Sequence, residues 1–421
     1  VVPYQVITRL GAEGSATGAD LQGVGGNLAG NYALGANIDA SATSSWNGGA
    51  GFDPIGGSGT NFSGAFDGLG HTISTLTINR PSENEVGLFA QTSNADIRNV
   101  GLPGSNITGR TYVGALVANS QGGTTTNAWS SGAVGGYSWV GGLIGLHNGG
   151  YVTQAHSSAE VVGTSQLVGG LIGQARFYGA VSDSYATGNV SASGATNVGG
   201  LIGQLRAVEL SDSYATGAVT GGSQVGGLIG FIDFFSGRGT TTGSYATGAV
   251  SGDYYVGGLV GVSSGAIVAS YASGAVSGSD VVGGLVGDNY GSITNSYWDS
   301  YSSGQSESVY GYVDPGTTAV TSDPSQSGAV DYAFRQSAYT GFDFTPGTGA
   351  WFMLDGGTRP FLQSEYSTTI RNTHQLQLMA MNLGASYTLG SNIDAAVTGS
   401  VAGVGSDMWS SSGFVPIGNS G

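Results

Sequence analysis

Apolar residues recur along the middle of this chain in one short phrase, Val140-Gly141-Gly142-Leu143-Ile144-Gly145. The phrase returns almost unchanged at five later positions and in looser form at two earlier ones. The other copies begin at Val86, Val113, Val168, Val198, Val225, Val256 and Val282. From Val86 to Val282 there are 196 residues in seven intervals, a mean period of 28 residues. A fixed period of about 20 to 50 residues is typical of repeat proteins, whose units bury their apolar faces against their neighbours.

A second phrase follows about 16 residues after the first in each period. It has the form Ser-Tyr-Ala-Thr-Gly-x-Val, and an apolar residue precedes most of its tyrosines by four positions. The clearest copies are Ser184–Val190, Ser213–Val219, Ser244–Val250 and Ser270–Val276. One period therefore holds three short β segments separated by glycine turns. We predict a parallel β-helix with three short strands per rung of about 28 residues, because stacked rungs satisfy each other's backbone groups at a spacing of about 4.8 Å.

The repeated tyrosine and its looser counterparts form an aromatic file that stacking would align along the β-helix. Its members are Trp129, His156, Tyr185, Tyr214, Tyr245, Tyr271 and Tyr297. If the file faces outward, it offers a platform for sugar rings, and if it faces inward, it is a structural ladder. We favour the structural ladder, since stacking alone accounts for the repetition.

The chain divides into four stretches. Residues 1–80 read as short strands and turns without a convincing helix, and residues 81–300 carry the periodic rungs. Residues 301–365 form the loop-rich end of the module, with 302–327 expected to be loop. The sequence of residues 28–40 recurs in similar form at residues 383–395, an offset of 355 residues. Residues 366–421 are therefore predicted to begin a second copy of a module of about 355 residues.

Composition narrows the class of protein. Glycine contributes 80 of 421 residues without a Gly-X-Y period, which excludes collagen. Only 9% of residues are charged, the net charge is −16, and all ten basic residues are Arg. Such a surface repels phosphate backbones, so we expect no nucleic-acid partner. No apolar run approaches the roughly 18 residues of a membrane span. With neither an initiator Met nor a signal peptide, Val1 is expected to be a cut inside a larger protein.

The absence of cysteine fits an extracellular bacterial protein that crosses its envelope unfolded, although chance and compositional bias explain it equally well. The four histidines lack any close ligand spacing, and neither a nucleophile elbow nor a phosphate-binding loop occurs. We therefore predict no catalytic residues, no metal site and no cofactor, apart from weak Ca²⁺ binding by scattered turn carboxylates. Asp183 and Asp212 occupy equivalent places in neighbouring rungs and could form an acid/base pair. Because Gln154 and Asn295 hold the same place elsewhere, two solvated turn carboxylates are the favoured interpretation.

Loops after the first phrase in three adjacent rungs are the candidate contact sites. There the period stretches to 30 and 31 residues, and Arg and aromatic residues gather in a chain poor in both. Insertions in repeat proteins map to one face, often the binding face. An apolar loop folded over its own rung is the alternative. The candidate residues are Arg176, Phe177, Tyr178, Arg206, Phe231, Phe234, Phe235 and Arg238.

The two repeated phrases together resemble the GLUG motif. Phe52-Asp53-Pro54-Ile55-Gly56, Phe66–Ile73 and Asn295–Asp299 are similar to phrases that surround this motif in large filamentous-haemagglutinin-like adhesins of Gram-negative bacteria. The resemblance implies a right-handed parallel β-helix, two-partner secretion through an outer-membrane partner, and work at the cell surface in adhesion or biofilm formation. The motif itself carries no residues known for chemistry.

These observations predict a non-enzymatic, secreted cell-surface adhesin segment. Its rigid β-helical stalk would contact host or biofilm-matrix glycans or surface proteins. One alternative is an extracellular filament or sheath in which the protein associates with itself. Another is a β-helix enzyme that cleaves polysaccharides, since parallel β-helices also include lyases and hydrolases.

Overall fold

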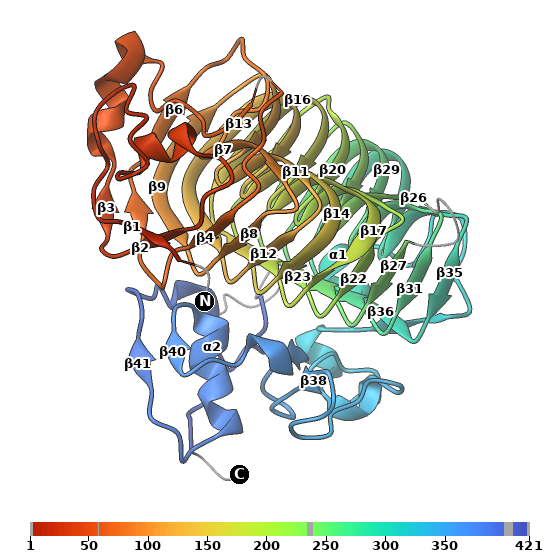
Figure 1. Ribbon diagram of the computed structural model, residues 1–421. Helices are drawn as coiled ribbons and strands as arrows, with labels where there is room; N and C mark the ends of the chain where they lie inside the picture. The colour runs from red at the N-terminus through yellow and green to blue at the C-terminus, as the bar shows by residue number, and fades with distance from the viewer. Residues whose placement is uncertain (1–2, 58, 234–238, 400–406, 419–421) are drawn as a thin grey trace.

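Parallel strands stack into one long β-helix of about 10 turns, each of about 28 residues. Figure 1 shows this computed structural model, in which residues 3–57, 59–233, 239–399 and 407–418 are described. The fold class is therefore as predicted: nearly all-β, with stacked parallel rungs and few helices.

The register of the rungs follows the sequence period. Val113 pairs with Val140, Val140 with Val168, and Val168 with Val198. The same pairing continues from Val198 to Val225, Val256 and Val282. One period is thus one turn, and each phrase lies directly over its previous copy.

A single rung contains more strands than the three segments expected from sequence. The rung of residues 202–226 has five short parallel strands, which positive-φ residues and glycines separate at the corners. Two sheets of 17 and 18 strands contain these segments. The first sheet consists of β1 Gln5–Ile7, β2 Tyr32–Leu34, β4 Ala65–Asp67, β7 Phe89–Ser93, β8 Asp96–Arg98, β11 Val117–Gln121, β12 Thr124–Thr126, β14 Ile144–Thr153, β17 Ile172–Ser182, β21 Ile202–Arg206, β22 Glu209–Ser211, β26 Ile229–Asp233, β27 Thr240–Thr242, β30 Val260–Ser263, β31 Ala266–Val268, β34 Val286–Asn289 and β35 Ser292–Thr294.

The second sheet carries the tyrosine phrases. Its strands are β6 Thr77–Asn79, β9 Gly101–Thr108, β10 Thr111–Gly114, β13 Trp129–Gly141, β15 His156–Ser157, β16 Glu160–Gly169, β18 Tyr185–Ala186, β19 Val190–Ser191, β20 Thr196–Gly199, β23 Tyr214–Ala215, β24 Val219–Thr220, β25 Ser223–Gly226, β28 Tyr245–Ala246, β29 Val250–Gly257, β32 Tyr271–Ala272, β33 Val276–Gly283, β36 Ser296–Asp299 and β37 Thr317–Val320. A small additional pair, β3 Ile38–Asp39 and β5 Ile73–Ser74, lies in the N-terminal rungs.

The first phrase builds the β-helix interior. Val140, Leu143 and Ile144 are fully buried, as are their counterparts in the following rungs except Val282, which is partly buried. The glycines between them are required by close backbone contact: a Cβ on Gly170 would lie 2.1 Å from the carbonyl oxygen of Gly200 in the next rung. A side chain at this position would force neighbouring rungs apart.

Two stretches differ from the sequence predictions. Residues 1–80 contain the 3₁₀ helices η1 (Gln22–Gly26) and η2 (Ser41–Gly49) besides their short strands. The expected loop at 302–327 includes the end of α1 (Ser300–Ser303), strand β37 and the 3₁₀ helix η3 (Pro324–Gln326). The loop prediction was wrong for β37. Its residues Thr317–Val320 pair in parallel with β36 and extend the sheet by one strand.

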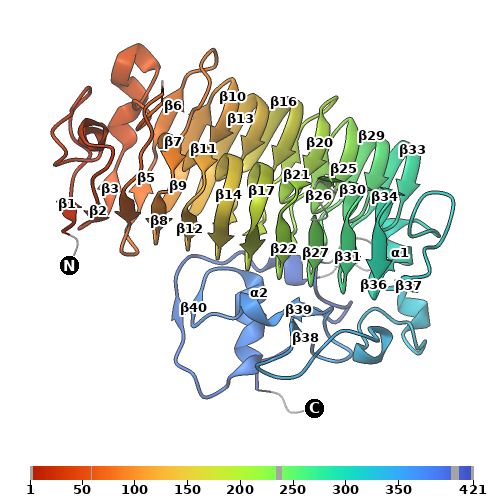
Figure 2. The same cartoon turned by 45° about the vertical axis from the view of Figure 1, so that its right-hand side comes forward.

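The C-terminal segment, defined here as residues 332–418, turns back and packs along the side of the β-helix (Figure 2). Its elements are η4 Gln336–Ala338, β38 Trp351–Phe352, β39 Phe361–Leu362, η5 Gln363–Glu365, β40 Thr369–Ile370, α2 Thr373–Leu378, η6 Met379–Met381, β41 Thr388–Leu389 and η7 Ala396–Thr398. Strands β38 and β39 are antiparallel, whereas β40 and β41 are parallel. Among the described residues, no helix has the length and apolar character needed to cross a bilayer.

Candidate functional site

The aromatic file forms one continuous stack along the β-helix. Ring centroids of successive members are 5.8 Å apart from Trp129 to His156 and 4.6–5.0 Å apart from His156 onward to Tyr271. Their planes are within 8° of parallel. Tyr297 continues the file, since its backbone pairs with that of Tyr271. The parallel register itself imposes this spacing on identical side chains.

These rings point away from the β-helix interior and lie under the C-terminal segment. Tyr214, Tyr245, Tyr271 and Tyr297 belong to an apolar cluster separate from the interior core. Trp351 packs 5.7 Å from Tyr271, and Phe342 packs edge-on 5.1 Å from Tyr297, measured between ring centroids. The file is therefore a structural ladder that faces outward and is covered by the C-terminal segment. The four tyrosine rings are buried and cannot serve as a stacking surface for sugars.

Polar contacts anchor the C-terminal segment to the part of the ladder between Tyr245 and Tyr297. The Arg359 guanidinium lies 2.6 Å from the Asp299 carboxylate, and both side chains are buried. Burial acts to raise the pKa of Asp299, but Arg359 outweighs it and holds the pKa below its usual value. The Tyr271 hydroxyl donates to the Pro360 carbonyl over 2.8 Å, and the Tyr245 hydroxyl donates to Glu365 over 2.8 Å.

His374 lies between two carboxylates at the centre of this interface. Its Nδ1 is 2.7 Å from Glu365, and its Nε2 is 2.7 Å from Asp407. Burial alone would lower the pKa of His374, but Asp407 and Glu365 together raise it to about 10. The ring is thus an imidazolium at neutral pH, bonded to both carboxylates. Asp407 also accepts a hydrogen bond of 2.5 Å from the Thr247 hydroxyl of the β-helix.

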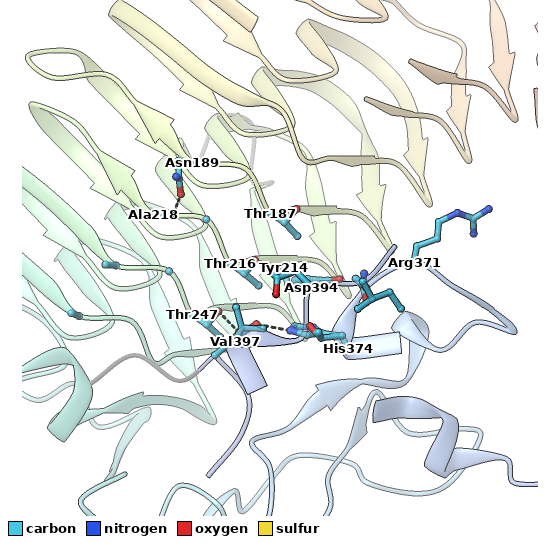
Figure 3. A pocket seen from close by; sticks show the side chains of 18 of the residues that line it. Thr187, Asn189, Tyr214, Thr216, Ala218, Thr247, Arg371, His374, Asp394 and Val397 are labelled. Atoms are coloured by element: carbon cyan, nitrogen blue, oxygen red, sulfur yellow. Dashed lines mark hydrogen bonds and ion pairs between the residues drawn. The ribbon is translucent and has the colours of Figure 1, made fainter. Parts of the chain in front are cut away.

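A cleft of about 710 Å³ opens beside this interface, between the β-helix and the C-terminal segment (Figure 3). One wall is a row of threonines, Thr187, Thr216 and Thr247, which occupy the same place in three successive rungs. Asn189 extends this wall and accepts a hydrogen bond of 3.0 Å from the Ala218 amide. The row is rigid because every threonine backbone is held by the rung before it.

The opposite wall comes from the C-terminal segment. It contains Arg371, Asn392, Asp394 and Val397, while His374 and Tyr214 lie at the base. The Asp394 carboxylate accepts a hydrogen bond of 2.9 Å from the Ala396 amide, which fixes its direction. Hydroxyl, amide and carboxylate groups thus line the cleft together with apolar side chains, whereas the Arg371 side chain extends away from it (Figure 3). This mixture suits a polyhydroxylated ligand that has alternating polar edges and apolar faces.

A smaller cavity of about 250 Å³ holds the two carboxylates singled out by sequence, Asp183 and Asp212. Burial, and then the charge of Asp183, raise the pKa of Asp212. Both residues have a positive φ, near 50°, as do Gln154 and Asn295 at the same corner of other rungs. This left-handed turn favours Asn and Asp, so the turn geometry accounts for the carboxylates without catalysis.

The predicted contact loops do come together at one corner of the β-helix. Arg176 and Arg206 occupy matching positions in neighbouring rungs, and their guanidinium carbons lie 5.0 Å and 5.8 Å from the Phe177 ring centroid. Arg206 also forms an ion pair of 3.1 Å with Asp233. Phe177 and Tyr178 adopt φ values of 59° and 61°, which bulky residues rarely do. Tyr178 is 54% exposed.

The remaining predicted contact residues divide into two groups. Phe231 is half-buried on β26, two positions before Asp233 and in register with Gln204. Phe234, Phe235 and Arg238 lie outside the described residues. The corner site predicted from sequence is therefore assembled in space for Arg176, Phe177, Tyr178 and Arg206.

Sequence reasoning missed the cleft. The threonine row corresponds to the fourth residue of the repeated Ser-Tyr-Ala-Thr-Gly-x-Val phrase. Nothing in the sequence indicates that the C-terminal segment lies opposite this row. A signal for Asp407 existed: aligning Asp407-Met408-Trp409 with Ser44-Ser45-Trp46 of the first copy shows a carboxylate where the first copy has a hydroxyl.

Residues 164–191 match the sequence model of a family described as the GLUG motif. The chain carries this motif. The match spans one rung, from strand β16 to strand β19, and contains one complete copy of each of the two phrases. This rung is thus a GLUG motif, as the resemblance of the two phrases indicated.

Two further similarities were found. The chain is 43% identical over 125 residues to halomucin of Haloquadratum walsbyi, a match that covers 28% of this chain and 1% of that protein. It is also similar to a solved structure from Bacteroides ovatus, provisionally described as an immunoglobulin A1 protease. That likeness has 23% identity and a TM-score of 0.42, covering 52% of this chain and 70% of the other.

Proposed function

We propose that this chain is an extracellular, non-enzymatic adhesion segment that binds glycans in the cleft between its threonine row and its C-terminal segment. The observation that carries the proposal is the cleft itself: a cavity of about 710 Å³ with hydroxyl and amide groups on a rigid wall and the Asp394 carboxylate on the wall opposite. Ligand pockets for small molecules have about 300–1,000 Å³, which accommodates a short oligosaccharide.

Composition and similarity support the extracellular setting. An acidic surface with 9% charged residues and no cysteine suits a secreted protein. The GLUG motif and the similarity to a mucin-named protein point the same way. We also propose export of the filamentous-haemagglutinin type through an outer-membrane partner, with roles in adhesion and biofilm formation, on the strength of the phrases around Phe52, Phe66 and Tyr297.

A glycan panel tests the cleft directly. We expect saturable binding of neutral oligosaccharides by the full chain and a loss of about fivefold or more in the double variant Thr187→Val, Thr216→Val, because lost hydrogen bonds cost about 0.5–1.5 kcal/mol each. Thr242→Val, which changes an exposed threonine on strand β27, is the matched control. Unchanged binding in the double variant would overturn the assignment to the cleft.

The corner around Phe177 is the second candidate contact surface, favoured by its two strained aromatic residues. Sparsely populated backbone conformations gather at functional sites because the surrounding structure has to hold them. In the same panel, loss of binding in Phe177→Ala and Arg176→Ala, with no loss in the threonine variant, would place the contact at the corner. Two guanidinium groups over a ring favour acidic sugars.

The enzyme alternative is tested by turnover. The raised pKa of Asp212 is the observation that favours it. Steady release of reducing ends or unsaturated sugars by the full chain, abolished in Asp212→Asn, would contradict a non-enzymatic function. We expect binding without release. Sedimentation at high concentration tests the filament alternative, for which a strictly monomeric rod would be contrary evidence.

A further inference from the structure

The C-terminal segment repeats several backbone contacts of the N-terminal rungs. Strand β40 pairs with β41 as β1 pairs with β2, placing Ile370 beside Leu389 as Ile7 lies beside Leu34. The Gly390 amide donates to the Ile370 carbonyl over 2.8 Å, as the Gly35 amide does to the Ile7 carbonyl.

Side chains repeat as well. The Tyr387 hydroxyl donates to the Asn382 carbonyl over 2.6 Å, and the Tyr32 hydroxyl donates to the Asn27 carbonyl over 2.8 Å. Trp409 stacks on Phe414 with ring centroids 6.5 Å apart, where the first copy has Trp46 and Phe52 at 6.3 Å. The second copy has therefore started a rung of the same kind.

What differs is the cover over that rung. In the first copy, β2 also pairs with β4, and Leu34 is fully buried. Within the described part of the chain, β41 pairs with β40 alone, and its Leu389 is 74% exposed. Leu383 and Val397 on the same segment are 63% and 50% exposed. An open strand edge with apolar side chains is a template for another strand.

The place of this rung is the side of the first β-helix, as both views of the chain show (Figures 1 and 2). The contacts of His374 with Glu365 and Asp407, and of Asp407 with Thr247, fix it there. The end of the first β-helix is already used: amides of Gly284, Leu285 and Val286 donate to the carbonyls of Glu307 and Ser308.

We propose that the open edge of β41 receives the next rung of a second β-helical module, a strand equivalent to β4, so that the second β-helix grows from the side of the first and the two axes are not collinear. This goes beyond glycan binding and predicts how serial modules of this kind are arranged. The cleft then lies between two modules.

A tandem chain tests the arrangement. Gly421 corresponds to Gly59, so residues 60–362 appended after Gly421 complete a second module in phase. Negative-stain images should show a second rod attached to the side of the first. A collinear rod, longer by about 48 Å for about 10 turns at about 4.8 Å each, would overturn the proposal.

Hydrogen exchange provides a second readout without a variant. In the single chain, Thr388 and Gly390 donate toward β40, so the Leu389 amide faces away from it. This amide should be protected in the tandem and should exchange rapidly in the single chain. Rapid exchange in both would contradict the proposal. The tandem chain keeps the threonine row unaltered. Glycan binding by the tandem therefore tests the proposed function, whereas the shape of the rods tests the module arrangement, and either can fail without the other.

Discussion

Single side chains decide how closely the rungs stack. At Gly170 the neighbouring carbonyl leaves no room for a Cβ, and the equivalent glycines Gly200 and Gly227 are in the same situation. The buried charges are equally local. His374 pairs with both Glu365 and Asp407, and Arg359 forms an ion pair with Asp299 farther along the ladder.

Replacing Gly170 by Ala should destabilise the β-helix by about 1–3 kcal/mol, because the added methyl group contacts backbone that cannot rotate away. The urea midpoint of the full chain measures the effect. Gly328→Ala, where a Cβ meets nothing within 4 Å, is the control. Equal midpoints for the two variants would contradict the close-contact explanation.

His374 should make docking of the C-terminal segment dependent on pH. Its folded pKa of about 10 lies above the ordinary value of about 6.5. Its stabilisation is therefore complete below about pH 6.5 and is lost as the pH rises through about 10. The His374 ring signals in NMR should titrate near pH 10. A midpoint near 6.5 would show that the two carboxylates do not hold the proton.

At the scale of elements, the rungs could be predicted from sequence, but the docking of the C-terminal segment on them could not. The phrases at Val140 and Tyr185 repeat with one period, and parallel stacking turns a period directly into register. This docking joins Tyr271 to Pro360 and Thr247 to Asp407, pairs separated by 89 and 160 residues and without a repeating pattern. Strand β37 was also missed in the sequence, because it is short, does not repeat and lies within polar residues.

The C-terminal segment should detach from the β-helix before the rungs unfold when the Arg359–Asp299 ion pair is removed. Arg359→Leu leaves the Asp299 carboxylate buried without its cation, a change that costs about 3–5 kcal/mol when one partner of a buried pair is lost. We expect limited proteolysis to cut within residues 332–366 first. Arg110→Leu, at an exposed site on the β-helix, controls for loss of charge. Simultaneous cleavage throughout the chain would mean that the C-terminal segment and the rungs unfold as one unit.

At the scale of the whole molecule, the proposed function belongs to the junction between the β-helix and its C-terminal segment. The corner around Phe177 could be proposed from sequence because its residues are close along neighbouring rungs. The cleft could not, because Thr216 and Asn392 meet only when the second copy docks on the ladder. Docking also explains how an outward-facing tyrosine ladder is shielded from solvent.

The most direct test of the central claim is chemical-shift mapping of the full chain during titration with a neutral oligosaccharide that binds in the panel. The account predicts saturable shifts at Thr187, Thr216 and Asn392 on both walls of the cleft. Shifts confined to Arg176, Phe177 and Tyr178, with the cleft residues unchanged at saturation, would contradict it.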